Sequence, residues 1–375
     1  MSIMQNHPPT DANELTRAAP CLITGATGQI GSECVRQLNA AGITPTVLMR
    51  RPLPAGGWRG ACVEEVTGDL DSVVDGECPP ALRRALARTR VLFHLAARVN
   101  LAGRGADNMA RINSRAALGL FRAAQRAGVE RFVQVSSTAA VGCSSIPTAI
   151  NEDADFNLAQ FRNPYFDTKR EAEGMLLRAW RDGLAQDRNR RNSAPATELV
   201  IVNPSVTIGR NRSFRRLART RKRRPPPAPG SFLYKLICFW FEGGVNLMDV
   251  RDAARGILLA AIHGTPGKRY ILAGDNLTTH DLMLHLGRIF GTSGPRIRIP
   301  LAFLSASAVL AERWASLTGR RTRLNRTTAR LAGPYWFYDA SRAREELGFR
   351  ARPIEETLTD LRDWTLELRE SGQQK

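Results

Sequence analysis

The first half of the chain alternates short apolar runs with longer stretches whose apolar residues recur every three to four positions. The short runs have the length of buried strands, and the longer stretches have the period of amphipathic helices. Strands are predicted in the run that ends at Gly25 and at 44–51, 61–70, 91–97, 131–136 and 199–203. Because helical stretches separate these strands, the pattern predicts an α/β fold with a Rossmann-type, doubly wound parallel sheet.

The length of the chain predicts a second, smaller domain at the C-terminus. With 375 residues the chain exceeds the usual size of one domain, about 100–200 residues. We expect a disordered leader at 1–19, a larger domain at 20–203 and a smaller part at 204–375, with 245–275 returning to the larger domain. Residues 232–241 are strongly apolar and predict either a helix that lines a substrate pocket or ordinary core or dimer packing. Residues 300–317 predict a helix that packs on the protein, since Glu312 and Arg313 interrupt its apolar run.

The net charge of +19 is concentrated in one segment. Residues 210–224 contain nine basic and no acidic residues and precede a proline-rich tract. Because zinc-finger spacing and an aromatic RNA-binding signature are both missing from the sequence, we do not expect a specific nucleic-acid partner. The segment is interpreted as a solvated loop or as a contact for an anionic cofactor, partner or membrane surface.

The polar N-terminus lacks the apolar centre of a signal peptide, and no apolar run has the length of a membrane span. The six cysteines are scattered without a Cys-x-x-Cys pair. These features predict a cytoplasmic protein without a metal site.

Three glycines follow the first strand and carry the clearest chemical signal. The pattern predicts a tight turn at Gly25, a close approach of backbone to phosphate at Gly28, and a helix packed against the strand at Gly31. A strand-to-helix turn without a ligand has the same pattern. The second strand ends in Arg50 and Arg51 without the carboxylate that binds a ribose hydroxyl, which favours NADP over NAD.

Two further positions could carry chemistry or serve structure. Asp69 follows the third strand and could either bind the adenine amino group or cap the next turn. Tyr165 and Lys169 are four residues apart and therefore lie on one helix face. A nearby ammonium is expected to lower the pKa of a phenol, which suits proton exchange with a carbonyl or alcohol. Ser137, after the fifth strand, could hold the substrate oxygen.

The chain resembles the extended short-chain dehydrogenase/reductases, also called the NAD-dependent epimerase/dehydratase family. The resemblance covers about residues 20–365 and rests on six motifs in order: Thr24-Gly-Ala-Thr-Gly-Gln-Ile-Gly31, Phe93-His-Leu-Ala-Ala97, Val135-Ser-Ser-Thr-Ala-Ala-Val-Gly142, Tyr165-x-x-x-Lys169, Asn203-Pro-Ser205 with Gly209, and Asp249-Val-Arg-Asp252. It implies an NAD(P)-binding Rossmann domain at 20–203 and a mainly substrate-binding part at 204–375. It also implies hydride transfer with Tyr165 as acid/base, Lys169 as its partner and Ser137 as the hydroxyl. It also implies that Asn113 supports the lysine through water. Carried over by position, cofactor contacts fall on Tyr165 and Lys169 themselves and on Thr27, Gln29, Ile30, Leu70, Ala96, Ala97, Pro204, Ser205 and Val206.

The subgroup is similar to dihydroflavonol-4-reductase-like, 3-beta-hydroxysteroid-dehydrogenase-like and hopanoid-associated sugar epimerase-like members. Two departures count against a sugar nucleotide. Residues 202–209 lack the Arg-x-x-Asn-x-Tyr-Gly-Pro type of segment, and Ala139-Ala140 replace the Asp-Glu that dehydratases usually carry.

These observations favour an NADP-dependent oxidoreductase that acts on a carbonyl or secondary alcohol of a small, fairly hydrophobic molecule. An NAD-dependent nucleotide-sugar epimerase is the first alternative. A non-catalytic cofactor-binding module with an anionic partner is the second. The family resemblance also implies a homodimer formed through the helices at 108–128 and 165–184.

Overall fold

The computed structural model describes residues 12–54, 56–58, 60–101, 105–188, 196–210, 238–292, 294–319, 322 and 325–373. The basic segment 211–224, the proline tract 225–230 and most of the apolar stretch 232–241 therefore lie outside the described residues.

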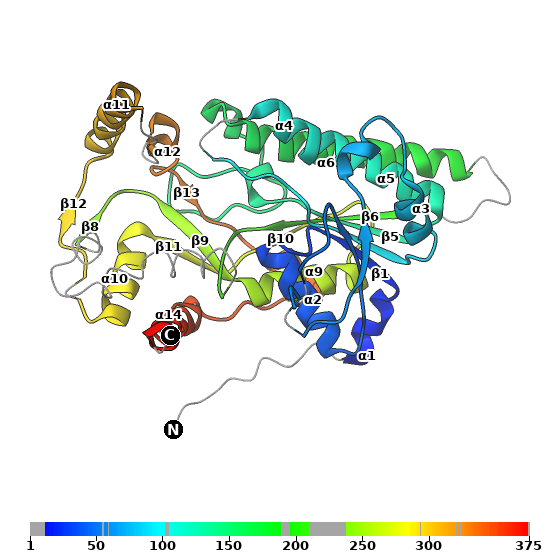
Figure 1. The fold of residues 1–375 in the computed structure, drawn as a ribbon. Helices are drawn as coiled ribbons and strands as arrows, with labels where there is room; N and C mark the ends of the chain where they lie inside the picture. The colour runs from blue at the N-terminus through cyan, green and yellow to red at the C-terminus, as the bar shows by residue number, and fades with distance from the viewer. Residues whose placement is uncertain are drawn as a thin grey trace.

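A seven-stranded sheet forms the centre of the larger domain (Figure 1). Its strand order is β10-β6-β5-β4-β1-β2-β3, and each neighbouring pair is parallel. The strands are β1 (Cys21–Thr24), β2 (Thr46–Met49), β3 (Glu64–Thr67), β4 (Val91–His94), β5 (Arg131–Val135), β6 (Glu198–Pro204) and β10 (Arg269–Leu272). The order reverses between β1 and β4, which is the position where doubly wound sheets bind their ligands. The predicted fold class is confirmed.

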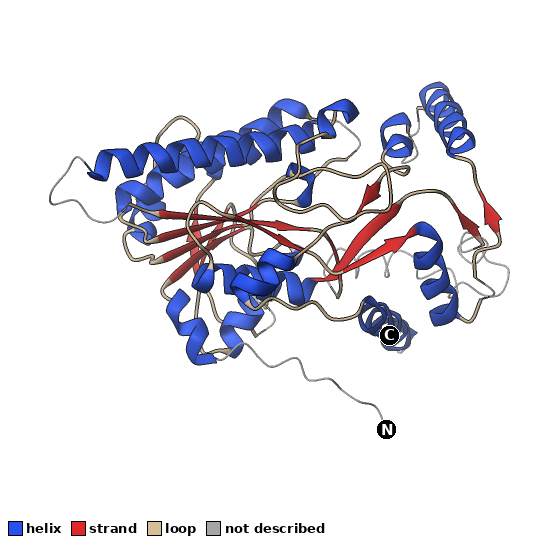
Figure 2. Cartoon of the chain, turned by 180° about the vertical axis from the view of Figure 1, so that it is seen from behind, coloured by secondary structure: helices blue, strands red, loops and turns tan. Residues whose placement is uncertain are grey.

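Helices cover both faces of this sheet, so each face buries its own core (Figure 2). One face carries α2 (Gln29–Ala40) and α9 (Val250–His263). The other face carries α3 (Pro80–Leu86), α5 (Ala116–Ala127) and α6 (Pro164–Arg188). Helix α4 (Ala106–Ala110) continues into α5 through a single π-helical turn, η3 (Arg111–Arg115). Short 3-10 turns lie at η2 (Leu70–Val73), η4 (Thr138–Ala140) and η5 (Leu158–Phe161).

The prediction of a disordered leader is wrong for residues 12–19. Helix α1 (Ala12–Leu15) and the turn η1 (Thr16–Ala18) pack against α9, and Leu15 and Ala18 are buried in the core. These two side chains anchor a segment that is otherwise polar. Residues 1–11 are not among the described residues.

The C-terminal part adds a second sheet in which β9 (Gly244–Asp249) pairs with three strands. Its partners are β7 (Val206–Ile208), β11 (Asp275–Thr278) and β13 (Tyr335–Trp336). A two-stranded sheet joins β8 (Phe239–Trp240) to β12 (Ile297–Arg298). The helices are α10 (Thr279–Phe290), α11 (Leu301–Thr318), α12 (Arg326–Arg330), α13 (Ser341–Leu347) and α14 (Ile354–Gln373).

Three expectations for this part need correction. Within 245–275, α9 and β10 belong to the larger domain, but β9 belongs to the smaller sheet. Residues 239–240 form a strand that pairs with β12, so the helical one of the two interpretations of 232–241 is wrong for these residues. Helix α11, expected to pack on the protein, contacts α12 but buries only Ala308 among its residues. Among the described residues, none of the helices combines the length and hydropathy needed to span a bilayer.

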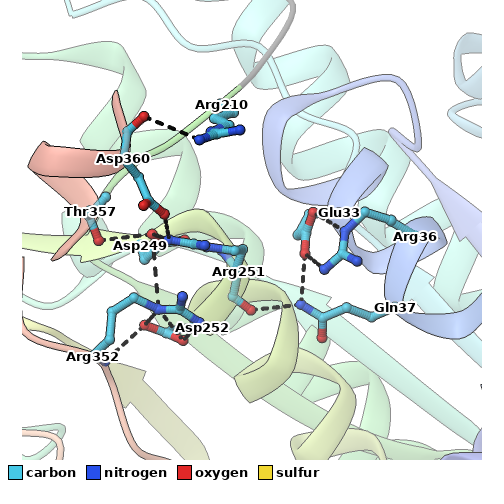
Figure 3. A network of polar contacts seen from close by, with 10 residues as sticks. All are labelled: Glu33, Arg36, Gln37, Arg210, Asp249, Arg251, Asp252, Arg352, Thr357 and Asp360. Carbon is cyan, nitrogen blue, oxygen red and sulfur yellow. Dashed lines mark hydrogen bonds and ion pairs between the residues drawn. The ribbon is translucent and has the colours of Figure 1, made fainter. Parts of the chain in front are cut away.

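Asp249 is the polar junction between the two sheets (Figure 3). Its buried carboxylate caps α9 by accepting a bond from the Arg251 backbone N–H (2.7 Å), and it also accepts from the Arg251 guanidinium and from Thr357 on α14. The Arg251 carbonyl accepts a bond from Gln37 on α2 (2.8 Å). The motif at 249–252 thus connects β9, α9, α14 and α2.

Candidate active site

The glycine turn between β1 and α2 is closed by close backbone contacts. Gly25 has φ of +72°, and a Cβ there would lie 2.7 Å from the backbone nitrogen of Ala96. A Cβ on Gly31 would lie 2.3 Å from the carbonyl oxygen of Gly25. Only hydrogen fits at these two positions, so the turn can pack tightly against α2 and against the end of β4.

A cavity of about 1020 Å³ opens at this turn. It lies at the carboxyl ends of β1, β2, β3 and β4. Nine predicted cofactor residues line it: Gly25, Thr27, Gly28, Arg50, Arg51, Asp69, Leu70, Ala96 and Ala97. The other predicted contacts, Gln29, Ile30, Gly31, Tyr165, Lys169, Pro204, Ser205 and Val206, are not among the lining residues.

Arg98 and Asn108 also line the cavity, and the sequence analysis missed both. The Arg98 guanidinium donates to the side-chain oxygen of Asn108 (2.8 Å). Arg98 directly follows the Ala96-Ala97 turn, so its position after the fourth strand was the available signal. The three lining arginines, Arg50, Arg51 and Arg98, outnumber the two lining carboxylates, Asp69 and Asp71, which suits a phosphorylated ligand.

Asp69 caps the turn that follows β3. One of its carboxylate oxygens accepts a bond from the Asp71 backbone N–H (3.1 Å). The structure therefore shows the capping role, while the carboxylate still lines the cavity where an adenine contact remains a prediction.

Tyr165 and Lys169 are both buried near the start of α6. Burial raises the pKa of the Tyr165 phenol above its usual value, and a hydrogen bond with the Ser137 side chain opposes this shift. The expectation that the Lys169 ammonium makes the phenol more acidic is wrong for this structure, because desolvation outweighs the other effects. The Lys169 ammonium instead donates to the carbonyl of Val135 (3.1 Å), and burial lowers the pKa of Lys169 to about 8.

A buried carboxylate, Glu173, lies one helical turn beyond Lys169 and was not identified from the sequence. It accepts a hydrogen bond from the Asn203 amide (2.6 Å) and lies 3.3 Å from the Arg269 guanidinium. Glu173 opposes the fall in the pKa of Lys169. The spacing of four residues after Lys169 was the signal that could have revealed it.

Asn113 lies in the π-helical turn η3, and such turns often occur at functional sites. Its amide bonds both the N–H and the carbonyl of Arg98 (2.8 and 3.0 Å) and donates to the Thr168 hydroxyl (3.2 Å). Asn113 therefore contacts the residue beside Lys169. Its water-mediated support of the lysine stays a prediction.

An apolar cluster surrounds Tyr165. The Tyr165 ring lies 6.2 Å from that of Phe166, and Trp336 lies 5.8 Å from Phe166 and 6.0 Å from Phe161. Leu331 packs against the same cluster. Since Trp336 comes from β13 of the smaller sheet, both parts of the chain build the apolar surroundings of the phenol.

The site fits a nicotinamide dinucleotide. The glycine turn lines a cavity in which arginines outnumber carboxylates. At the end of β6, the buried Ser205 hydroxyl has no hydrogen-bond partner within the described part of the chain. In those same residues, no group of three or more His, Cys, Asp or Glu is arranged to hold a metal ion.

Residues 21–273 match the model of the NAD dependent epimerase/dehydratase family. The chain belongs to this family. It is an enzyme of the extended short-chain dehydrogenase/reductase type and uses a nicotinamide nucleotide for oxidoreductase or epimerase chemistry.

Relatives in this family extend over almost the whole chain. A putative dihydroflavonol 4-reductase from Synechocystis sp. is 29% identical over 94% of this chain and 97% of its own length. Sterol demethylase protein B from Methylococcus capsulatus is 29% identical over 92% and 97%. A ceramide reductase from Caulobacter vibrioides is 40% identical over 32% of this chain and 34% of its own. The crystal structure of gox2253 superposes with a TM-score of 0.69 at 29% identity, covering 92% of this chain and 98% of that one.

Proposed function

We propose that the protein is an NADP-dependent oxidoreductase that reduces a carbonyl, or oxidises the matching secondary alcohol, on a small and fairly hydrophobic molecule. The observation that carries the proposal is the Tyr165 phenol beside the Ser137 hydroxyl, enclosed by the aromatic residues Phe161, Phe166 and Trp336. A sugar ring would require hydrogen-bonding groups around it, whereas the side chains packed around the phenol are mostly apolar. The names of the ceramide reductase and the dihydroflavonol reductase agree with a reductive reaction on an apolar compound.

The residues of this chain would carry out the proton transfer of the reaction. Bound NADPH would supply the hydride to the carbonyl carbon. Ser137 would hold the carbonyl oxygen, and the Tyr165 hydroxyl would give that oxygen its proton, so that the product is an alcohol. The raised pKa of Tyr165 keeps the phenol protonated at neutral pH, which suits reduction.

NADP preference is inferred from the end of β2. Arg50 and Arg51 both line the cavity there, and guanidinium groups match a 2′-phosphate. Titration with NADPH and NADH, followed by tryptophan fluorescence, tests this. We expect tighter binding of NADPH, and the variant Arg50→Ala with Arg51→Ala should lose the preference while it retains NADH binding. Equal binding of both nucleotides by the unmodified protein would contradict it.

Tyr165→Phe tests the chemical step. The variant should lose turnover on a panel of apolar ketones and aldehydes but bind NADPH normally, since it lacks only one hydroxyl. The matched control is Tyr270→Phe, which also removes one phenolic hydroxyl, but one that donates to Glu346 (2.6 Å) outside the site, and it should retain turnover. Unchanged turnover in Tyr165→Phe would overturn the assignment. Release of stoichiometric NAD from denatured protein, with no net nicotinamide turnover, would favour an epimerase instead.

A further inference from the structure

Helix α11 presents an apolar stripe to solvent. Four large side chains are exposed: Phe303 (65%), Leu310 (65%), Trp314 (67%) and Leu317 (84%). Their spacings of seven, four and three residues place them within about 60° of one another at 3.6 residues per turn. We call these four residues the α11 stripe. Ala308, the buried residue of the helix, lies on the opposite side, so the helix packs through one face and turns the stripe outward.

The position of α11 leaves this stripe free of the rest of the described chain. The helix stands beside α12 at the end of the molecule, far from the helices that cover the large sheet (Figure 1). A contiguous exposed stripe of Phe, Leu and Trp is unusual for a helix that meets only water. A surface helix normally exposes its polar residues.

Positive charge accompanies the stripe. Arg313 is exposed on α11 itself. Residues 320–330, which follow α11 in the sequence, contain five arginines and no acidic residue. Glu312 of α11 forms an ion pair with one of them, Arg326 (3.4 Å), so the balance of charge remains positive. A second copy of the chain would bring the same arginines and the same overall charge of +19 to the contact, and like charges would repel. An anionic surface would instead attract them.

The segment after α11 also leads to the catalytic tyrosine. The Arg330 guanidinium of α12 lies 6.0 Å from the ring of Phe161 and donates to the carbonyl of Gln160 (3.1 Å). The next residue, Leu331, packs in the cluster around Tyr165 and accepts a bond from Trp336 (2.9 Å). Helix α12 thus lies in the sequence between the helix that carries the α11 stripe and the apolar cluster around Tyr165.

We propose that the α11 stripe docks the protein on an anionic lipid surface. The apolar side chains enter the boundary between headgroups and acyl chains, and Arg313, at the edge of the stripe, binds an anionic headgroup. Tryptophan suits such a boundary because its ring is apolar and its N–H is polar. Docking in this orientation places α12 and the apolar cluster next to the membrane. The proposal does not rest on the redox activity, and its test requires no substrate.

The test is flotation of the full chain with vesicles of phosphatidylcholine alone and of phosphatidylcholine mixed with phosphatidylglycerol. We expect binding to the mixed vesicles, weaker binding to phosphatidylcholine, and a decrease as salt is raised. The double variant Leu310→Ser with Trp314→Ser should reduce the partition coefficient about tenfold or more. Leu317→Ser, at the most exposed position, is a milder second variant. Ile146→Ser is the matched control, because Ile146 is 60% exposed outside α11, and it should bind normally.

Circular dichroism and NADPH titration would show that the variants fold. Vesicle binding that is equal in the unmodified protein and both stripe variants would overturn the proposal. A stripe variant that turns a dimer into a monomer, with no vesicle binding by the unmodified protein, would assign the stripe to a second copy and would also overturn it.

Discussion

Replacing Gly31 by alanine should separate the cofactor site from the stability of the fold. The added Cβ would lie 2.3 Å from the Gly25 carbonyl oxygen and 2.9 Å from the Ala26 Cα. Real Cβ contacts are at least about 3.0 Å, so the start of α2 must move away from the turn by about 0.7 Å. Overpacking of this kind costs about 1–3 kcal/mol of folding free energy.

The same displacement moves the backbone N–H groups that would meet the pyrophosphate. A hydrogen bond to a charged group contributes about 1.5–3 kcal/mol, so loss of one such bond weakens NADPH binding about tenfold to a hundredfold. Chemical denaturation measures the first effect, and tryptophan quenching by NADPH measures the second.

Gly42→Ala is the control at the other end of α2. Gly42 has φ of +76° with no atom within 4 Å of an added Cβ. Alanine there costs about 1 kcal/mol through backbone strain but should bind NADPH normally. If Gly31→Ala binds NADPH as well as the unmodified protein does, the glycine turn is only a structural turn and the reasoning fails.

Three further predictions concern buried titratable side chains. Asp249→Asn should reduce the free energy of unfolding by about 2–3 kcal/mol, because it breaks the ion pair between the buried Asp249 and Arg251. Asp360 is the exposed partner of the same arginine, so Asp360→Asn should cost less than about 1 kcal/mol. Equal losses in denaturant titrations would contradict the role of Asp249 as the polar junction between the sheets. Burial lowers the pKa of His94 from 6.5 to about 3. Below pH 6.5 the histidine therefore binds a proton in the unfolded chain but not in the folded one, and the stability should fall by about 1.4 kcal/mol per pH unit. His94→Leu should lack this slope. Burial likewise lowers the pKa of Lys169 from 10.5 to about 8. Between these pH values only the unfolded lysine still holds its proton, so the stability of the protein should rise with pH relative to that of Lys169→Met. Parallel pH profiles of the unmodified protein and the variant would contradict the lowered pKa of His94 or of Lys169, respectively.

Local patterns in the sequence determined the larger domain. The alternation of apolar runs and amphipathic stretches predicted a parallel sheet, and strands β1 to β6 lie within or close to the predicted ranges. The turn at Gly25 and the helix end at Gly128 could be predicted because a positive φ has a residue-specific cost, and both glycines have positive φ. The cationic end of β2 was predictable too, because the carboxyl ends of parallel strands meet at one edge.

The tertiary structure decided the features that depend on distant contacts. Leu15 and Ala18 are ordered because α9 receives them, and residues 239–240 form a strand because 297–298 pair with them. The pKa of Tyr165 depends on how much water the cluster from η5, α6 and β13 removes, which spacing along one helix does not reveal. The sequence could not show which face of α11 meets the protein, because an apolar helix has several faces that could pack. Its neighbour α12 contacts one of them, and the α11 stripe is left outside.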